Sequence, residues 1–166
     1  MAPSRHPQRQ SNCGPSNRYC DMQIENRQAA LCIFRRASTF LVAEIVDPHS
    51  GAVLHRPPGG GIEPGETPEQ AVRREVMEEL GIELTDVEPI GYIDHIWQWK
   101  SREIHERAFI FLADPADDPR LDRGETIELI EADGLHSRTL WLSIDSAPDQ
   151  LPPICPSRLL ELLRVR

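Results

Sequence analysis

The segment of residues 60–82, GGIEPGETPEQAVRREVMEELGI, constrains this chain more than any other part of it. It places Glu75, Glu78 and Glu79 at positions i, i+3 and i+4. On an α-helix these positions share one face, where like charges repel one another and destabilise the helix. A bound cation that neutralises the carboxylates is the simplest reason to keep them together. Because carboxylate oxygens without a nearby His or Cys suit a hard ion, the segment predicts a site for Mg²⁺ or Mn²⁺.

The same segment predicts a helix over about residues 68–80 with a marked beginning and end. Thr67 can act as the N-cap, and Gln70 completes a capping box with it. Pro68 suits the first helical position, and Gly81 suits the left-handed conformation that ends a helix. An apolar stripe that we expect to face the core runs beside the acidic face and consists of Val72, Val76 and Leu80.

The pattern G-x5-E-x7-R-E-U-x-E-E-x-G-U, in which U is aliphatic, resembles the signature of the Nudix hydrolases. All of its defined positions are filled, by Gly60, Glu66, Arg74, Glu75, Val76, Glu78, Glu79, Gly81 and Ile82. The resemblance, to a MutT-like standalone domain, implies an α/β/α sandwich with a mixed β-sheet and a catalytic loop–helix motif. It also implies a metal-dependent pyrophosphohydrolase that cleaves the phosphoanhydride bond of a nucleoside diphosphate linked to another group X.

The resemblance and the residue types together suggest roles within the motif. The expected metal ligands are Glu75, Glu78, Glu79 and the Gly60 carbonyl. Arg74 and Glu66 would hold these ligands in place by charge-assisted hydrogen bonds. The general base stays open, since a helix glutamate or an acid from a downstream loop can fill this role in the family. The expected catalytic set is Glu66, Arg74, Glu75, Glu78 and Glu79.

Candidate substrate contacts lie next to the motif and farther along the chain. Gly59, Gly60 and Gly61 allow the backbone to come close to a ligand, and Arg56 is a candidate phosphate contact. Downstream acids are candidates for a further metal ligand or a base, although each alone is more typical of a solvated surface. They are Glu103, Glu106, Glu125, Glu128 and Glu131.

Aromatic side chains alternate along residues 92–100, so that His95, Trp97 and Trp99 share one face of an expected strand. One interpretation is a platform on which a nucleobase stacks, with Trp97 and Trp99 as substrate contacts. The other is ordinary sheet packing, which is common for aromatic residues in strands.

Composition narrows the class of protein. The 166 residues suit one small domain, which we expect over residues 25–166 after a mobile tail over residues 1–24. A formal net charge of −9 makes nucleic acid an unlikely partner, since phosphate-backbone binding needs a basic surface. A small nucleotide remains compatible, because a divalent metal can bridge two anions. With no apolar span and no signal-peptide core, a cytoplasmic location is expected.

The order of predicted elements surrounds the motif with strands. We expect a hairpin of residues 29–34 and 39–46, a strand over 52–56, a second hairpin of residues 87–100 and 103–113, strands over 126–131 and 139–142, and a closing helix over 157–165. The four cysteines show no metal-ligand spacing, and Cys32 lies in an apolar strand.

Several functions are compatible with these features. No subfamily signature identifies the group X, so a nucleoside triphosphate is the default expectation. A nucleotide-binding sensor of the same fold without turnover and an RNA 5′-end pyrophosphohydrolase are the alternatives. The intact acid set argues against the first alternative, and the acidic composition argues against the second. A homodimer is expected from family habit alone.

Overall fold

The computed structural model describes residues 23–100, 102–115, 118–130, 136–146, 151 and 153–165. The expected tail therefore lies outside the described residues up to position 22, and the first strand begins at Gln23. The elements are β1 Gln23–Ile33, β2 Arg35–Arg36, β3 Thr39–Val46, β4 Val53–Arg56, β5 Gly59–Gly61, α1 Pro68–Leu80, β6 Leu84–Trp99, β7 Arg102–Pro115, α2 Pro119–Arg123, β8 Glu128–Ile130, β9 His136–Ser143 and α3 Leu159–Arg164.

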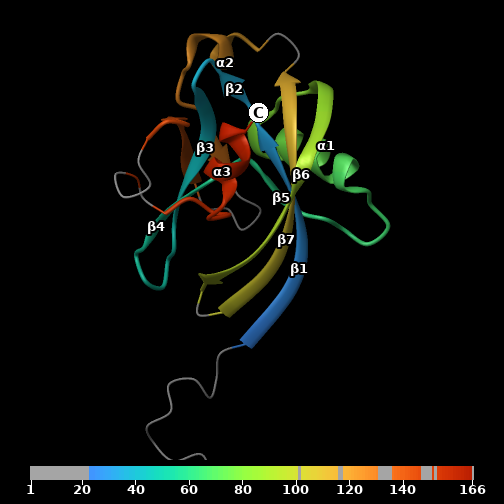
Figure 1. Ribbon diagram of the computed structural model, residues 1–166, viewed down its shortest axis with the longest axis vertical. Coiled ribbons are helices and arrows are strands. Elements are labelled where there is room, and N and C mark those ends of the chain that lie inside the picture. The colour runs from blue at the N-terminus through green and yellow to red at the C-terminus, as the bar shows by residue number, and fades with distance from the viewer. Residues whose placement is uncertain are drawn as a thin grey trace, which may run out of the picture.

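The described strands form two sheets (Figure 1). The first has the order β5–β1–β7–β6, and it is mixed because β1 and β7 run parallel whereas the other pairs are antiparallel. The second has the order β2–β3–β9–β8, with β4 paired to β3, and all its pairs are antiparallel. The expected mixed sheet is confirmed.

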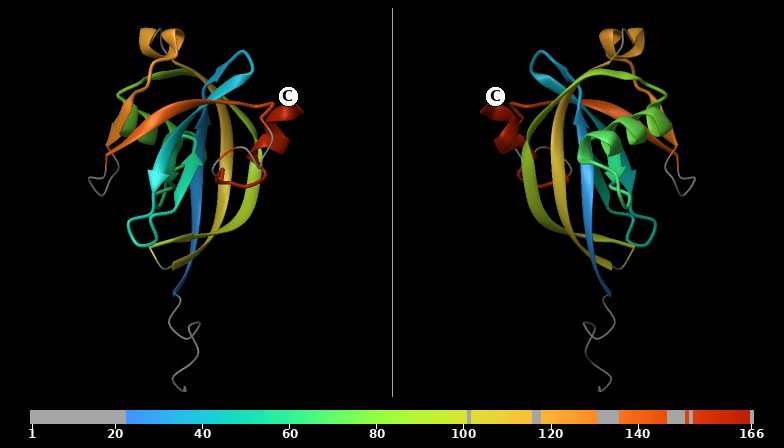
Figure 2. Two further views of the ribbon diagram at one scale, coloured as in Figure 1. Left: turned by 90° about the vertical axis from the view of Figure 1, so that its left-hand side faces the viewer. Right: turned by 90° about the vertical axis from the view of Figure 1, so that its right-hand side faces the viewer.

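The second half of strand β1, residues 29–33, is buried on both of its faces. Successive side chains of a strand point to opposite sides. Ala30 and Cys32 pack in one core cluster with helix α1, whereas Leu31 and Ile33 pack in a second cluster with helix α3. Figure 2 shows the two helices on opposite sides of the strands. This layering is the α/β/α sandwich that the sequence predicts.

Helix α1 has the predicted bounds and caps. The Thr67 side chain accepts a hydrogen bond from the Gln70 amide at 3.2 Å, and the Gln70 side chain accepts one from the Thr67 amide at 2.8 Å. Gly81 has a φ of 66°, and its amide donates to the Met77 carbonyl at 3.0 Å. The buried side chains are Ala71, Val72, Val76 and Leu80, which include the predicted stripe. These local interactions fix how α1 presents its acidic face.

The first predicted hairpin is wrong. Residues 29–34 and 39–46 belong to different sheets: after β1 the chain crosses over, and the short strand β2 is the hairpin partner of β3. Both segments are mostly apolar, so their pattern does not reveal which strands they pair with. The second hairpin, formed by β6 and β7, is confirmed.

Two further differences concern helices. The segment after β7, predicted as a polar loop, contains the short helix α2, whose N-cap Asp118 accepts a hydrogen bond from the Arg120 amide at 2.9 Å. The last helix, α3, is shorter than predicted. None of the helices in the described residues is long and apolar enough to cross a membrane.

Candidate active site

Strand β5 lies between β1 and α1, and its glycines make this close approach possible. Gly59 has a φ of 128°, and a Cβ added to it would lie 2.2 Å from the Ala30 carbonyl oxygen. A Cβ on Gly60 would lie 2.5 Å from the carboxyl carbon of Glu75. A Cβ on Gly61 would have no atom within 4 Å. The backbone of β1 therefore requires a glycine at position 59, a side chain at position 60 would have to displace the Glu75 carboxylate, and position 61 has room for a side chain.

Arg74 connects the acidic residues of the motif. Its Nε and Nη2 donate to the two carboxylate oxygens of Glu66 at 2.9 and 3.0 Å. Its Nη1 donates to Glu75 at 2.9 Å and to Glu78 at 3.2 Å, and Nη2 also donates to the Gly61 carbonyl at 3.0 Å. This guanidinium offsets the repulsion between the glutamates and connects helix α1 to strand β5. Its hydrogen bonds hold the pKa of Glu66 below the usual range.

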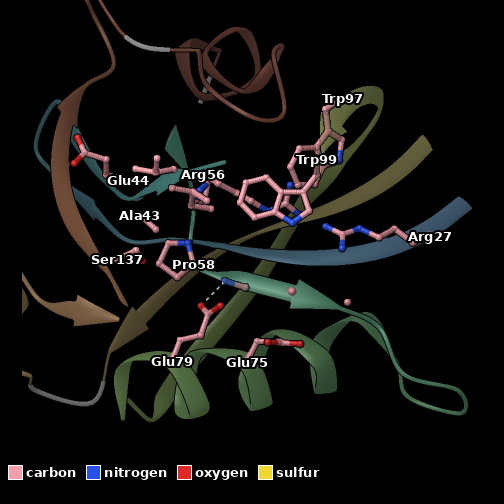
Figure 3. A pocket seen from close by; sticks show the side chains of 16 residues that line it. Arg27, Ala43, Glu44, Arg56, Pro58, Glu75, Glu79, Trp97, Trp99 and Ser137 are labelled. Carbon is pink, nitrogen blue, oxygen red and sulfur yellow. Dashed lines mark hydrogen bonds between the residues drawn. The ribbon is translucent and has the colours of Figure 1, made fainter. Parts of the chain in front are cut away.

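Glu75 and Glu79 face the same space from successive turns of α1. Glu79 accepts a hydrogen bond from the Gly59 amide at 3.0 Å (Figure 3). Burial raises the pKa of Glu75, although the hydrogen bond from Arg74 opposes this shift. Glu78 has a side chain that is 61% exposed and turned toward Arg74. The structure thus brings Glu75 and Glu79 together at one surface and leaves Glu78 at its margin.

The carboxylates of α1 are suitable ligands for a hard divalent cation, but in this structure they bind other groups of the protein. In the described part of the chain, no three His, Cys, Asp or Glu side chains converge as a ready metal site. The reason is visible in the partners, since Glu75 and Glu78 bind Arg74 and Glu79 binds a backbone amide. Carboxylates and backbone carbonyls are the ligands that Mg²⁺ and Mn²⁺ prefer. A cation would take over the neutralising role that Arg74 fills for Glu75 and Glu78.

A cavity of about 360 Å³ opens over these acids. The predicted substrate-contact residues line the cavity together with Glu75 and Glu79. Three other predicted site residues do not line it, namely Glu66, Arg74 and Glu78. Figure 3 shows the two glutamates on one side and the tryptophans with their neighbouring arginines on the other. The residues that line the cavity include Arg27, Glu44, Arg56, Gly59, Gly60, Gly61, Glu75, Glu79, Trp97 and Trp99.

A buried ionic cluster forms the wall opposite the acids. The sheet register places Arg27, Glu106 and His95 side by side on β1, β7 and β6. The Glu106 side chain is fully buried, pairs with Arg27, and lies 2.9 Å from His95 Nε2. Arg56 reaches across from the second sheet, with Nη2 2.8 Å from Glu106. Arg27 was not predicted from the sequence, because nothing near it in the chain indicates a site.

The position of Glu106 does not support its earlier interpretation as a metal ligand or base. Burial disfavours its charge, but the charges of Arg56 and Arg27 and the hydrogen bond with His95 outweigh this effect. The pKa of Glu106 is therefore held well below its usual range. We interpret Glu106 as the anchor of the arginines.

Trp97 packs tightly into this wall. The guanidinium carbons of Arg27 and Arg56 lie 5.3 and 5.2 Å from its ring centroid, and its ring stacks with His95 at 6.4 Å. Its indole Nε1 is buried and has no hydrogen-bond partner among the described residues. Packing within the sheet thus explains the position of Trp97. Because Trp97 also lines the cavity, contact between its ring and a substrate is a proposal that we take up below.

Of the other downstream acids, the three that the structure describes do not line the cavity. Glu103 pairs with His105, Glu125 pairs with Arg123, and Glu128 is exposed. Glu131 lies outside the described residues.

Replacing Glu106 should destabilise the fold in a pH-dependent way. We expect Glu106→Gln to lower the free energy of unfolding at pH 7 by about 3 kcal/mol, because Arg56 loses its buried counter-charge. A depressed folded-state pKa stabilises the fold above the unfolded-state pKa of about 4.3, and this contribution is lost as the pH falls. The difference from wild type in urea unfolding should therefore shrink between pH 7 and pH 3.

Glu103→Gln is the matched control for this measurement. Glu103 lies on the same strand and pairs with His105 at 2.7 Å, but both side chains are partly exposed. We expect its replacement to cost less than about 1 kcal/mol. Equal losses in both variants would contradict the assignment of Glu106 as a buried anchor.

Comparison with known proteins places this chain in a family. A family model described as the NUDIX domain matches residues 25–161. The MutT NUDIX hydrolase from Burkholderia pseudomallei has a similar structure, with a TM-score of 0.61 and 26% sequence identity over 86% of this chain and 99% of that chain. The ORF135 protein of E. coli is also similar, with a TM-score of 0.50 and 27% identity over 87% of this chain and 91% of that chain.

Curated relatives match a shorter segment. The nucleoside triphosphatase NudI of Enterobacter sp. (strain 638) is 58% identical over 40 residues, which are 23% of this chain and 28% of that protein. The protein of the same name from Escherichia coli O1:K1 / APEC is 52% identical over 40 residues. The matched segment thus spans less than a third of the length of these relatives. The family match over most of the chain, the sandwich fold and the intact loop–helix motif lead to one conclusion: this protein belongs to the Nudix hydrolase family.

Proposed function

We propose that this protein is a metal-dependent pyrophosphohydrolase that cleaves the phosphoanhydride bond of a nucleoside diphosphate linked to a group X. The observation that carries the proposal is that Glu75 and Glu79 lie opposite Trp97 and Arg56 in one cavity. One side offers carboxylates for a cation that binds phosphates. The other side offers flat rings and cationic groups suited to a nucleobase.

In the proposed reaction, Glu75, Glu78 and Glu79 hold Mg²⁺, for which Mn²⁺ can substitute. When bound by these residues, the cation would supply charge neutralisation at the diphosphate and would lower the pKa of a water molecule. Arg74 and Glu66 position the ligands through the hydrogen bonds described above. Glu75 and Glu79 both line the cavity, so either can accept the proton of the attacking water. Gly59, Gly60 and Gly61 admit the phosphates close to the backbone.

A nucleoside triphosphate is the substrate class that we propose, with a nucleoside monophosphate and pyrophosphate as products. The supporting observation is the 40-residue match to proteins named nucleoside triphosphatase. We further propose one Nudix domain over residues 25–166 acting on a free nucleotide in the cytoplasm. A homodimer remains a prediction.

Neutralising the metal-binding carboxylates tests this function. We expect Glu79→Gln and Glu78→Gln to lower kcat/KM for a nucleoside triphosphate by roughly 100-fold or more, because a lost ligand removes several kcal/mol of transition-state stabilisation. The measurement is the release of pyrophosphate and nucleoside monophosphate with Mg²⁺ or Mn²⁺. Glu69→Gln is the control, since Glu69 lies on the same helix but pairs with the exposed Arg73. Nucleotide binding without turnover in the wild type would support the sensor alternative instead.

The glycines of strand β5 allow a second test, in which a neighbouring glycine is the control. Gly60→Ala should reduce kcat/KM by roughly 100-fold, because its methyl group would displace the Glu75 carboxylate and a shift of about 1 Å at a catalytic group has this effect. Gly61→Ala should keep near-wild-type activity, since its added methyl group meets no atom within 4 Å. Thermal unfolding would confirm that both variants are folded. Equal activity in the two variants would count against the assigned position of Glu75.

A further inference from the structure

The wall of the cavity opposite the acids carries more positive than negative charge. Arg27 and Arg56 share the single carboxylate of Glu106. Among the residues that the structure describes, no second carboxylate pairs with either guanidinium; the other neighbour of Arg56 is the sulfur of Cys155, at 3.4 Å. Glu44 also lines the cavity, but its carboxylate is held by Arg138 at 3.0 Å. A partly buried cation without full compensation favours a ligand that accepts hydrogen bonds.

This wall is rigid and offers donors only. Glu106 is fully buried, and the side chain of Arg56 is 5% exposed, so this ion pair cannot rearrange freely. The Arg27 side chain is 31% exposed, and in Figure 3 its guanidinium points toward the tryptophans in the cavity. The Trp97 indole N–H is buried and has no partner among the described residues. Guanidinium and indole groups have no acceptor atom, so these three side chains offer a ligand no acceptor. The Arg27 side chain is the exposed donor among them, since Trp97 Nε1 and Arg56 Nη2 are buried behind it.

The neighbouring rings indicate which part of the substrate meets these donors. Trp97 and Trp99 lie 5.9 Å apart and both line the cavity, and such flat apolar surfaces suit a nucleobase better than a phosphate. Arginine pairs well with base carbonyl oxygens, as in its two-point contact with the O6 and N7 atoms of guanine. An exocyclic amino group in the same place would set donor against donor and leave buried N–H groups unpaired.

We propose that Arg27, Arg56 and Trp97 form a subsite that selects nucleobases with a carbonyl group at C6 of a purine or C4 of a pyrimidine. The subsite would disfavour the counterparts that carry an amino group at that position. Glu106 is the positioning residue that fixes both guanidinium groups. The inference rests on the proposed nucleoside triphosphate hydrolysis and adds the class of base to it.

Matched substrate pairs test the selection. ITP and ATP share the sugar, the triphosphate and the ring system and differ at the carbonyl or amino position with its adjacent ring nitrogen, and UTP and CTP form the same kind of pair. With Mg²⁺ and the full-length protein, we expect kcat/KM for the carbonyl substrate to exceed that for its amino partner roughly 10- to 100-fold in both pairs. Equal values, or a preference for the amino substrates, would overturn the proposal.

Variants assign the selection to the wall. Arg27→Gln should lower kcat/KM for ITP and UTP, mainly through KM, by a larger factor than for ATP and CTP, so that the ratio within each pair falls toward one. Arg107→Gln is its control, because Arg107 forms an ion pair with Asp94 away from the cavity, at 2.7 Å. Trp97→Phe should also reduce the ratio. Trp141→Phe should not, although Trp141 likewise has a buried, unpaired indole nitrogen among the described residues.

The outcomes separate the two levels of the proposal. If Arg27→Gln weakens all four substrates equally, Arg27 holds phosphates and the proposed base selection is wrong. If the wild-type protein turns over none of the four substrates, the proposed function itself fails. Turnover with a carbonyl preference that both Arg27→Gln and Trp97→Phe reduce would support the subsite.

Discussion

The repulsion between glutamates on one face of α1 is the constraint on which the site depends. Such a face is unfavourable by itself. Arg74 offsets it through hydrogen bonds to Glu66, Glu75 and Glu78, and the Gly59 amide does the same for Glu79. Each of these carboxylates thus has a partner within the folded protein, and in our proposal a divalent cation would replace these partners at Glu75, Glu78 and Glu79.

The cavity lies between two charged clusters of opposite character. Glu75 and Glu79 of α1, with the glycines of β5, form one side, and the arginines anchored by Glu106 form the other. The two sheets contribute separately, since Arg27 comes from the mixed sheet and Arg56 from the antiparallel one. A nucleotide has the matching polarity, with phosphates that need cations at one end and a polar ring at the other. The fold thus brings the groups that we propose for binding and for chemistry to one cavity.

Local features of the sequence predicted the structure well, and pairing between distant segments was not predictable in the same way. The bounds of α1 follow from Thr67, Gln70 and Gly81, whose interactions span only a few residues. The pairing of β1 with β7 joins residues far apart in the chain, and an apolar strand buried on both faces gives no sign of its neighbours. Arg27 was not predicted as a site residue for the same reason. Its role appears only when the sheet register brings it beside Glu106.

Uptake of a divalent cation by the acids of α1 tests the central claim most directly. Mn²⁺ can be titrated into the protein, with and without a non-hydrolysable nucleoside triphosphate analogue, while electron paramagnetic resonance follows the free ion. Our account predicts that the wild-type protein and Glu69→Gln bind Mn²⁺, that Mg²⁺ competes for the site, and that Glu79→Gln binds far more weakly. If the wild-type protein takes up no Mn²⁺ under either condition, the acidic face of α1 is not a metal site and the account is contradicted.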